Sequence, residues 1–154
     1  MLFLKGGGDD AGMTSSQELT GTTLERLTVG DAMHAGVFTC DENASLDMAA
    51  AMMARYSIHC VVVLDGPDDE KPWGVISDLD LISAAFDHDT AEWKAGEAAG
   101  SPAVMIGVDA PLRRAAQLMR EYGIAHLVVV DADARTPLGV ISTLDIARVI
   151  AGNA

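Results

Sequence analysis

Aromatic residues and cysteines are scarce in this sequence of 154 residues. Aromatic side chains make up only 5%, so a core must consist mainly of Val, Ile, Leu, Met and Ala. Two cysteines, Cys40 and Cys60, are too few for a disulfide framework, and their spacing does not match a zinc site. We therefore expect two small core residues and no bound metal.

Basic residues are also few, since ten Lys and Arg stand against 23 Asp and Glu, which gives a formal net charge of −13. An acidic surface repels phosphate backbones, so we expect no nucleic-acid partner. The same repulsion disfavours a free triphosphate as a ligand.

Long hydrophobic runs are missing too, although 49% of the residues are hydrophobic. No uninterrupted apolar run approaches the roughly 20 residues that span a bilayer. The first residues, Met1–Lys5, do not have the pattern of a secretion signal. We expect a soluble, cytoplasmic protein with no membrane partner, and a flexible, glycine-rich polar tail over residues 1–23.

The sequence contains an internal repeat. A shift of 66 residues brings ten identical residues of the segments 44–65 and 110–131 into register. Beyond a loop that is one residue shorter in the second copy, Gly74–Asp80 matches Gly139–Asp145 at six of seven positions. A half-size unit cannot bury its own sheet, so we expect the two copies to pack against each other.

Both copies predict the same elements. Apolar residues at helical spacing indicate helices over 46–56 and 112–122, with Asn43 and Asp109 as N-caps and Gly123 at a left-handed helix end. Runs of β-branched residues that are too apolar to alternate indicate strands covered on both faces. Strands are expected at 58–64 and 124–130, at 73–76 and 138–141, and near 37–39 and 103–105, with further helices from Ser77 and Ser142 onward.

The predicted fold class is therefore α+β, with two tandem β-α-β-β-α units packed with pseudo-twofold symmetry. Unit 1 is expected at residues 24–88 and unit 2 at 89–151. The sequence resembles a tandem pair of cystathionine-β-synthase (CBS) domains, the arrangement called a Bateman module. The resemblance rests on Val29–Met33, the helix 46–56, the strand Ile58–Val63 and the Gly-Val-Ile-Ser-x-Leu-Asp segment in both copies.

The resemblance implies a regulatory module that binds an adenosine compound, such as AMP, ADP, ATP or S-adenosylmethionine, between the two units. In the family pattern the Ser of the repeated segment meets phosphate and the Asp holds the ribose hydroxyls, which here are Ser77 and Asp80, and Ser142 and Asp145. A carboxylate suits a ribose because its two oxygens accept one hydrogen bond from each hydroxyl. The other candidate ligand contacts are His59, His126, Thr143 and Thr39.

Ser77-x-x-Asp80 and Ser142-x-x-Asp145 have a second interpretation, because each also has the pattern of a capping box. Between the two, the ligand role is favoured at Asp145, because its neighbour Thr143 adds a hydroxyl whereas Asp78 adds a second carboxylate. The scarcity of basic residues favours AMP or another lightly charged adenosine derivative, in one cleft rather than two.

The sequence contains no nucleophile beside a base and no phosphate-binding loop, so we expect no enzyme and no required cofactor. We expect a homodimer and a separately encoded protein that the module regulates. The alternative is a structural dimerisation module whose cleft holds no ligand.

Overall fold

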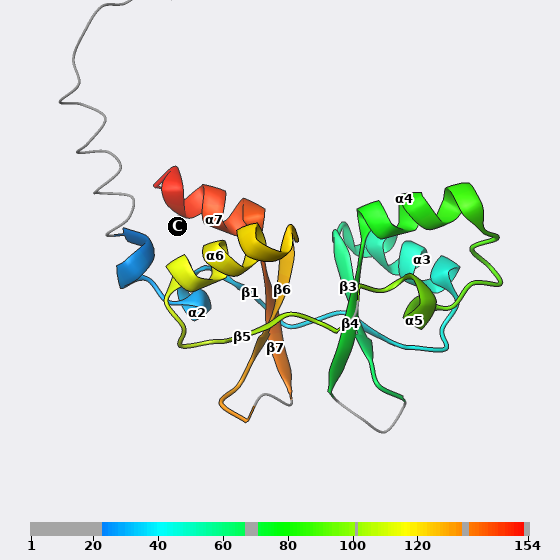
Figure 1. Ribbon diagram of the computed structural model, residues 1–154, viewed down its shortest axis with the longest axis horizontal. Coiled ribbons are helices and arrows are strands. Elements are labelled where there is room, and N and C mark those ends of the chain that lie inside the picture. The colour runs from blue at the N-terminus through cyan, green and yellow to red at the C-terminus, as the bar shows by residue number, and fades with distance from the viewer. Residues whose placement is uncertain (1–22, 67–70, 101, 134–135, 153–154) are drawn as a thin grey trace, which may run out of the picture.

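The computed structural model describes residues 23–66, 71–100, 102–133 and 136–152. The chain forms two small mixed sheets that face each other, with the helices on the outer sides (Figure 1). The predicted α+β architecture of two like units is thereby confirmed. Residues 1–22 of the predicted tail lie outside the described residues.

Each half contains the same arrangement of three strands, and the sheet of the second half has a fourth strand at its edge. The first sheet has the order β2-β3-β4 and the second β1-β7-β6-β5. The strands are β1 (His34–Ala35), β2 (Thr39–Asp41), β3 (Cys60–Leu64), β4 (Pro72–Ser77), β5 (Met105–Gly107), β6 (His126–Val130) and β7 (Pro137–Ser142). The pairs β2-β3 and β5-β6 are parallel, whereas the pairs β3-β4, β6-β7 and β1-β7 are antiparallel.

The central strands β3 and β6 are buried on both faces, as their apolar sequences predict. They begin two residues later than expected, at Cys60 and His126. The N–H groups of Ile58 and Ile124 still bond to the ends of the preceding helices, at Met53 O (3.1 Å) and Met119 O (3.0 Å). The short strands β2 and β5 also begin about two residues later than predicted.

Two helices cover the outer side of each sheet (Figure 1). They are α3 (Leu46–Tyr56) and α4 (Asp78–Asp87) in the first half, and α6 (Leu112–Tyr122) and α7 (Thr143–Ile150) in the second. The ends of α3 and α6 are confirmed, with left-handed backbone at Ser57 (φ 53°) and Gly123 (φ 65°).

The predicted N-caps Asn43 and Asp109 are wrong. The helices α3 and α6 follow Ser45 and Pro111 instead, and the Ser45 hydroxyl accepts a bond from Met48 N at 3.4 Å. Tight turns precede both helices, closed by hydrogen bonds from Ala44 N to Asp41 O and from Ala110 N to Gly107 O, each 3.0 Å. These turns use the residues that sequence reasoning assigned to the caps.

The halves exchange their leading segments. The short helix α2 (Val29–Ala32) packs on the second half, where Val29 N donates to Ala110 O at 2.8 Å. The short helix α5 (Ala95–Ala98) packs on the first half, where Ala95 N donates to Ala44 O, also at 2.8 Å. Each compact half therefore contains a segment from the other repeat. The predicted boundary after residue 88 therefore divides the two sequence repeats.

This exchange explains the glycine that opens each Gly-Val-Ile-Ser segment. A Cβ atom at Gly139 would collide with the backbone oxygen of His34 in β1, which pairs with β7. At Gly74 a Cβ would lie 2.9 Å from the Ala99 side chain and 3.0 Å from Gly100 O. At both glycines the leading segment lies too close to β4 or β7 to leave room for a side chain.

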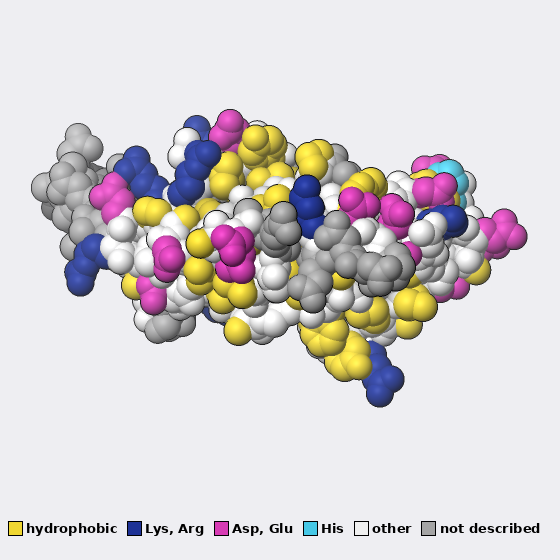
Figure 2. Space-filling model, turned by 90° about the horizontal axis from the view of Figure 1, so that it is seen from below, with side chains coloured by type: hydrophobic (Ala, Val, Ile, Leu, Met, Phe, Trp, Pro, Cys, Tyr) yellow, Lys and Arg dark blue, Asp and Glu magenta, His cyan; other side chains and the backbone are white. Residues whose placement is uncertain are grey.

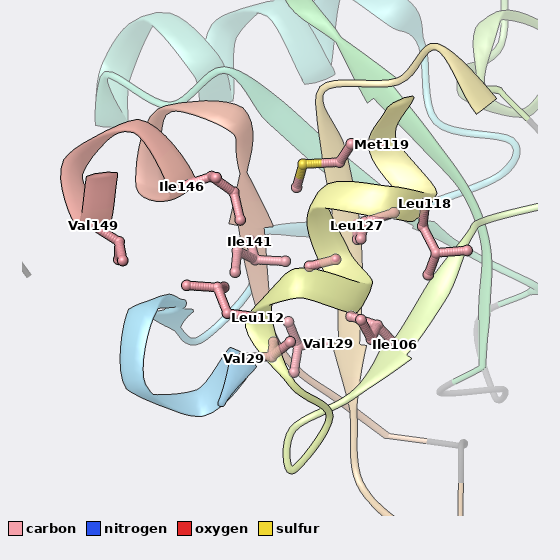
Figure 3. Close-up of a cluster of buried hydrophobic side chains, with 11 residues drawn as sticks. Val29, Ile106, Leu112, Leu118, Met119, Leu127, Val129, Ile141, Ile146 and Val149 are labelled. Atoms are coloured by element: carbon pink, nitrogen blue, oxygen red, sulfur yellow. The ribbon is translucent and has the colours of Figure 1, made fainter. Parts of the chain in front are cut away.

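The core of the second half shows how the exchanged segment is held. Val29 of α2 is fully buried beside Leu112 and Val129 (Figure 3). Complete burial of a valine stabilises a fold by about 1.5–3 kcal/mol. A third cluster of buried residues, including Val62 and Val128, joins the two sheets. The exchange and this joint core fix the halves relative to each other.

Acidic and basic side chains are scattered among hydrophobic ones on the face that Figure 2 shows. Among the described residues, no helix is long and apolar enough to cross a membrane.

Candidate ligand-binding cleft

A cleft of about 380 Å³ lies where the two halves meet the crossing segment of β1. Its size is within the range of about 300–1,000 Å³ that is usual for small-molecule sites. The lining comes from both halves and from the residues after α2. Its members are His34–Phe38, Ser57–Cys60, His126, Val140, Ser142, Leu144, Asp145 and Arg148.

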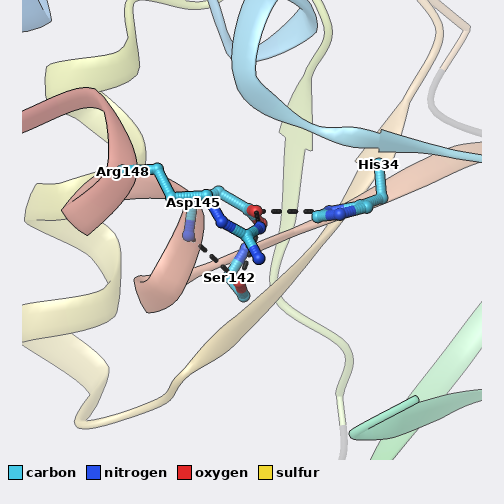
Figure 4. A network of polar contacts seen from close by, with 4 residues as sticks. All are labelled: His34, Ser142, Asp145 and Arg148. Carbon is cyan, nitrogen blue, oxygen red and sulfur yellow. Dashed lines mark hydrogen bonds and ion pairs between the residues drawn. The ribbon is translucent and has the colours of Figure 1, made fainter. Parts of the chain in front are cut away.

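Asp145 is the most constrained polar residue of the cleft, with 2% of its surface exposed. Its Oδ2 accepts hydrogen bonds from Ser142 N (2.8 Å) and Ser142 Oγ (2.7 Å). Its Oδ1 lies 3.0 Å from Arg148 Nη1 and 3.2 Å from His34 Nδ1 (Figure 4). One oxygen therefore caps helix α7, and the other is covered by two side chains that are themselves exposed.

A second, smaller hollow of about 190 Å³ lies on the other side of this cluster and shares His34, Asp145 and Arg148 with the cleft. The side chains of His34 and Arg148 therefore line both hollows. Because both side chains are about half exposed or more, they can move with little loss of packing, and their movement would uncover Asp145 Oδ1.

The equivalent residue in the first half, Asp80, makes the same capping box. Its Oδ2 accepts hydrogen bonds from Ser77 N (2.7 Å) and Ser77 Oγ (2.6 Å). Among the described residues, however, no basic side chain pairs with Asp80. The capping interpretation of both Ser-x-x-Asp motifs is thus confirmed, but only Asp145 also faces the cleft.

The first turns of α4 and α7 differ in one backbone donor. In α4, Leu79 N donates to the side chain of Asp78 at 2.9 Å. In α7 the equivalent position of Asp78 is Thr143, and Leu144 N has no acceptor among the described residues. Leu144 lines the cleft. Its N–H, unlike that of Leu79, is not used by a side chain of the same turn, and a free N–H at the start of a helix favours an anion.

Two further histidines, His59 and His126, line the cleft together with His34. His59 Nδ1 donates to Asp78 Oδ2 at 2.9 Å, and this hydrogen bond is the main reason that the pKa of Asp78 is lowered. Burial lowers the pKa of His126, and the nearby charge of His59 adds to this effect. The negative charges of Asp78, Asp145 and Asp80 have the opposite effect and raise the pKa of His126.

Cys60 contributes a protonated thiol to the cleft wall. Burial, with a smaller contribution from the charge of Asp78, raises the pKa of Cys60 to about 12. Burial likewise raises the pKa of Cys40 to about 11. Neither thiol is a thiolate at neutral pH, and no group of three potential metal ligands occurs among the described residues.

The structure brings together four of the eight predicted site residues, Ser142, Asp145, His59 and His126. The other four, Ser77, Asp80, Thr143 and Thr39, do not line this cleft. Sequence reasoning missed His34 and Arg148. A signal existed for both, because the equivalent positions in the other repeat are Gly100 and Ser83, so each is a departure from the repeat.

The fold, the duplicated Gly-Val-Ile-Ser-x-Leu-Asp segment and the cleft between two like halves define a CBS domain pair. The CBS domain family model matches residues 29–87 and 95–152, and the chain belongs to this family. The uncharacterized protein MJ1404 of Methanocaldococcus jannaschii is 30% identical over 143 residues, which cover 83% of this chain. The chain spans 33% of that relative's length.

Solved structures share the fold. The CBS domain pair of protein MJ0100, in complex with 5′-methylthioadenosine and S-adenosyl-L-methionine, has a TM-score of 0.74 and 24% identity, covering 83% of this chain and 98% of that one. The CBS domain protein PAE2072 from Pyrobaculum aerophilum, complexed with AMP, has a TM-score of 0.71 and 24% identity, covering 82% and 99%.

Proposed function

We propose that this CBS pair is a regulatory module that binds one adenosine-containing ligand of low charge, of the AMP or S-adenosylmethionine type, at Asp145. The observation that carries the proposal is the cleft of about 380 Å³, which joins apolar walls from both halves to a single buried carboxylate. The adenosine ligands of the structural relatives MJ0100 and PAE2072 support the ligand class.

The residues of the cleft suit the parts of such a ligand. Val37, Phe38 and Ile58 offer apolar surface to a base, and the Phe38 ring is already stacked on Tyr56 at a centroid distance of 4.5 Å. Asp145 Oδ1 can accept from ribose hydroxyls once His34 and Arg148 release it. Leu144 N and His126 can receive a single phosphate.

The ligand joins surfaces from both halves, so its binding would stiffen the pair and alter how it meets a separately encoded partner. No catalytic step and no cofactor are part of this proposal. ADP and ATP are disfavoured by the net charge of −13.

A thermal-shift panel of AMP, ADP, ATP, S-adenosylmethionine and NADH tests the proposal. A ligand at a hundred times its Kd adds about 2.7 kcal/mol of stability. At roughly 2–4 °C per kcal/mol, the midpoint should rise by several degrees with AMP or S-adenosylmethionine. The proposal is wrong if none of the five compounds raises the midpoint.

The second candidate is a structural dimerisation module. It is favoured by the exposed apolar side chains of α4 and α7, the two helices along the upper edge of Figure 1. Their exposed residues are Leu79, Ile82, Phe86, Leu144 and Ile150. We expect a second copy of the chain to cover them, so Phe86→Glu, at a side chain that is 85% exposed, should convert a dimer to a monomer in light scattering. A wild-type monomer would contradict this expectation.

A further inference from the structure

The ion pair between His59 and Asp78 has no counterpart in the second half of the molecule. The two residues lie at equivalent positions to Ala125 and Thr143, because the same backbone hydrogen bond joins each couple. Asp78 N donates to His59 O at 3.0 Å, and Thr143 N donates to Ala125 O at 2.9 Å. The repeat thus shows that neither side chain is needed to build this corner of the fold.

Asp78 is held in place as a negative charge next to the cleft. Its Oδ2 accepts from His59 Nδ1 and its Oδ1 from Leu79 N, both at 2.9 Å. His59 itself lines the cleft, so a group that contacts this imidazole is separated from Asp78 by a single ring. The negative charge of Asp78 also raises the pKa of His126, another histidine of the cleft wall.

Few basic side chains around the cleft are free to pair with a second or third phosphate group. Arg148 and His34 both pair with Asp145, and Asp80 adds another carboxylate within electrostatic range of His126. The ion pair with Asp78 therefore engages His59, whose side chain is 70% exposed and could otherwise turn toward a phosphate chain.

We infer that the His59–Asp78 pair is a selectivity device that limits the cleft to adenosine ligands with at most one phosphate. This inference rests on the proposed function and names the residue that sets its charge limit. In this proposal a monophosphate is received at Leu144 N and His126, and a longer phosphate chain that reaches His59 meets the carboxylate of Asp78. A cationic ligand such as S-adenosylmethionine meets no such penalty.

The repeat supplies the substitution that tests the inference. Asp78→Thr introduces the residue of the second half, and Asp87→Asn removes one negative charge at the far end of the same helix as a matched control. Titration calorimetry on the full chain at pH 7.5 and constant ionic strength gives the Kd of adenosine, AMP and ATP for each protein. Thermal midpoints without ligand show that each variant is folded.

We expect Asp78→Thr to lower the Kd of ATP by about two- to fivefold relative to that of adenosine, the effect of removing one partly exposed charge. Asp87→Asn should leave the ratio unchanged. His59→Ala, which leaves Asp78 unpaired, should move the ratio in the opposite direction. This second variant keeps the test decisive if Asp78→Thr does not fold.

Two results would overturn the inference in distinguishable ways. If adenosine binds and neither Asp78→Thr nor His59→Ala changes the ratio of the two Kd values, the selectivity role is wrong and the proposed function stands. If no protein of the series binds adenosine, AMP or ATP, the proposed function fails and the selectivity role fails with it.

Discussion

The two capping aspartates, Asp80 and Asp145, have the same sequence context and the same hydrogen bonds to their serines, yet their surroundings differ. Asp145 is 2% exposed and is covered by His34 and Arg148, whereas Asp80 is only half-buried and keeps the cap alone. The difference comes from outside the repeated motif, because His34 belongs to the leading segment and Arg148 to the following helix turn. The repeated motif therefore builds the same helix start twice. Residues outside the motif, here His34 and Arg148, determine how the capping aspartate is surrounded.

The largest expected effect is on stability at these two positions. Asp145→Ala should lower the free energy of unfolding by about 2–3 kcal/mol, because helix α7 loses its capping box and the contacts with His34 and Arg148 are lost together. Asp80→Ala should cost about 1 kcal/mol, the value of a cap alone. Urea unfolding of both variants measures the difference, and equal losses would show that His34 and Arg148 add nothing.

The crossing of β1 over β7 can also be disturbed by a substitution in β7. Gly139→Ala should destabilise the protein by about 1–2 kcal/mol, because the new methyl group collides with the backbone of His34. Gly107→Ala is the control, since a Cβ there meets nothing within 4 Å. Thermal unfolding compares the two, and a neutral Gly139→Ala would contradict the account of this glycine.

Removal of a side chain that covers Asp145 should increase the affinity for the ligand at Asp145. We expect His34→Ala to tighten AMP binding about two- to fivefold, because the ribose no longer displaces an imidazole from Asp145 Oδ1. Titration calorimetry measures the change. Weaker binding in His34→Ala would mean that His34 contacts the ligand instead of covering its site.

The smallest effect concerns pH. His126 has a lowered pKa in the folded state, so the unfolded chain, with a value of about 6.5, takes up its proton first as the pH falls. Stability should therefore decrease from about pH 6.5 downward until the folded state is protonated as well. His126→Gln should flatten this part of the curve, which urea unfolding at pH 5, 6, 7 and 8 records. An unchanged slope would contradict the assignment to His126.

Most elements of this fold could be predicted from sequence because their signals are local. Helical spacing over Leu46–Tyr56, β-branched runs and the repeat itself gave α3, α6, β3 and β6 within two residues. The errors at Asn43 and Asp109 arose because a turn and a helix start favour the same small polar residues.

The exchange of leading segments could not be predicted. The contacts of Val29 with Ala110 and of Ala95 with Ala44 join distant parts of the chain, and no periodicity records them. For the same reason His34 was missed, although it covers the very carboxylate that the motif identified. Ser142 and Asp145 could be predicted because they lie in the repeated motif, whereas the place of His34 depends on where the crossing segment lies.

The most direct test of the account is the stoichiometry of ligand binding by titration calorimetry with AMP. We expect one AMP per chain, with binding lost in Asp145→Asn and retained in Asp80→Asn. Two AMP molecules per chain, or binding that survives in Asp145→Asn and disappears in Asp80→Asn, would contradict it.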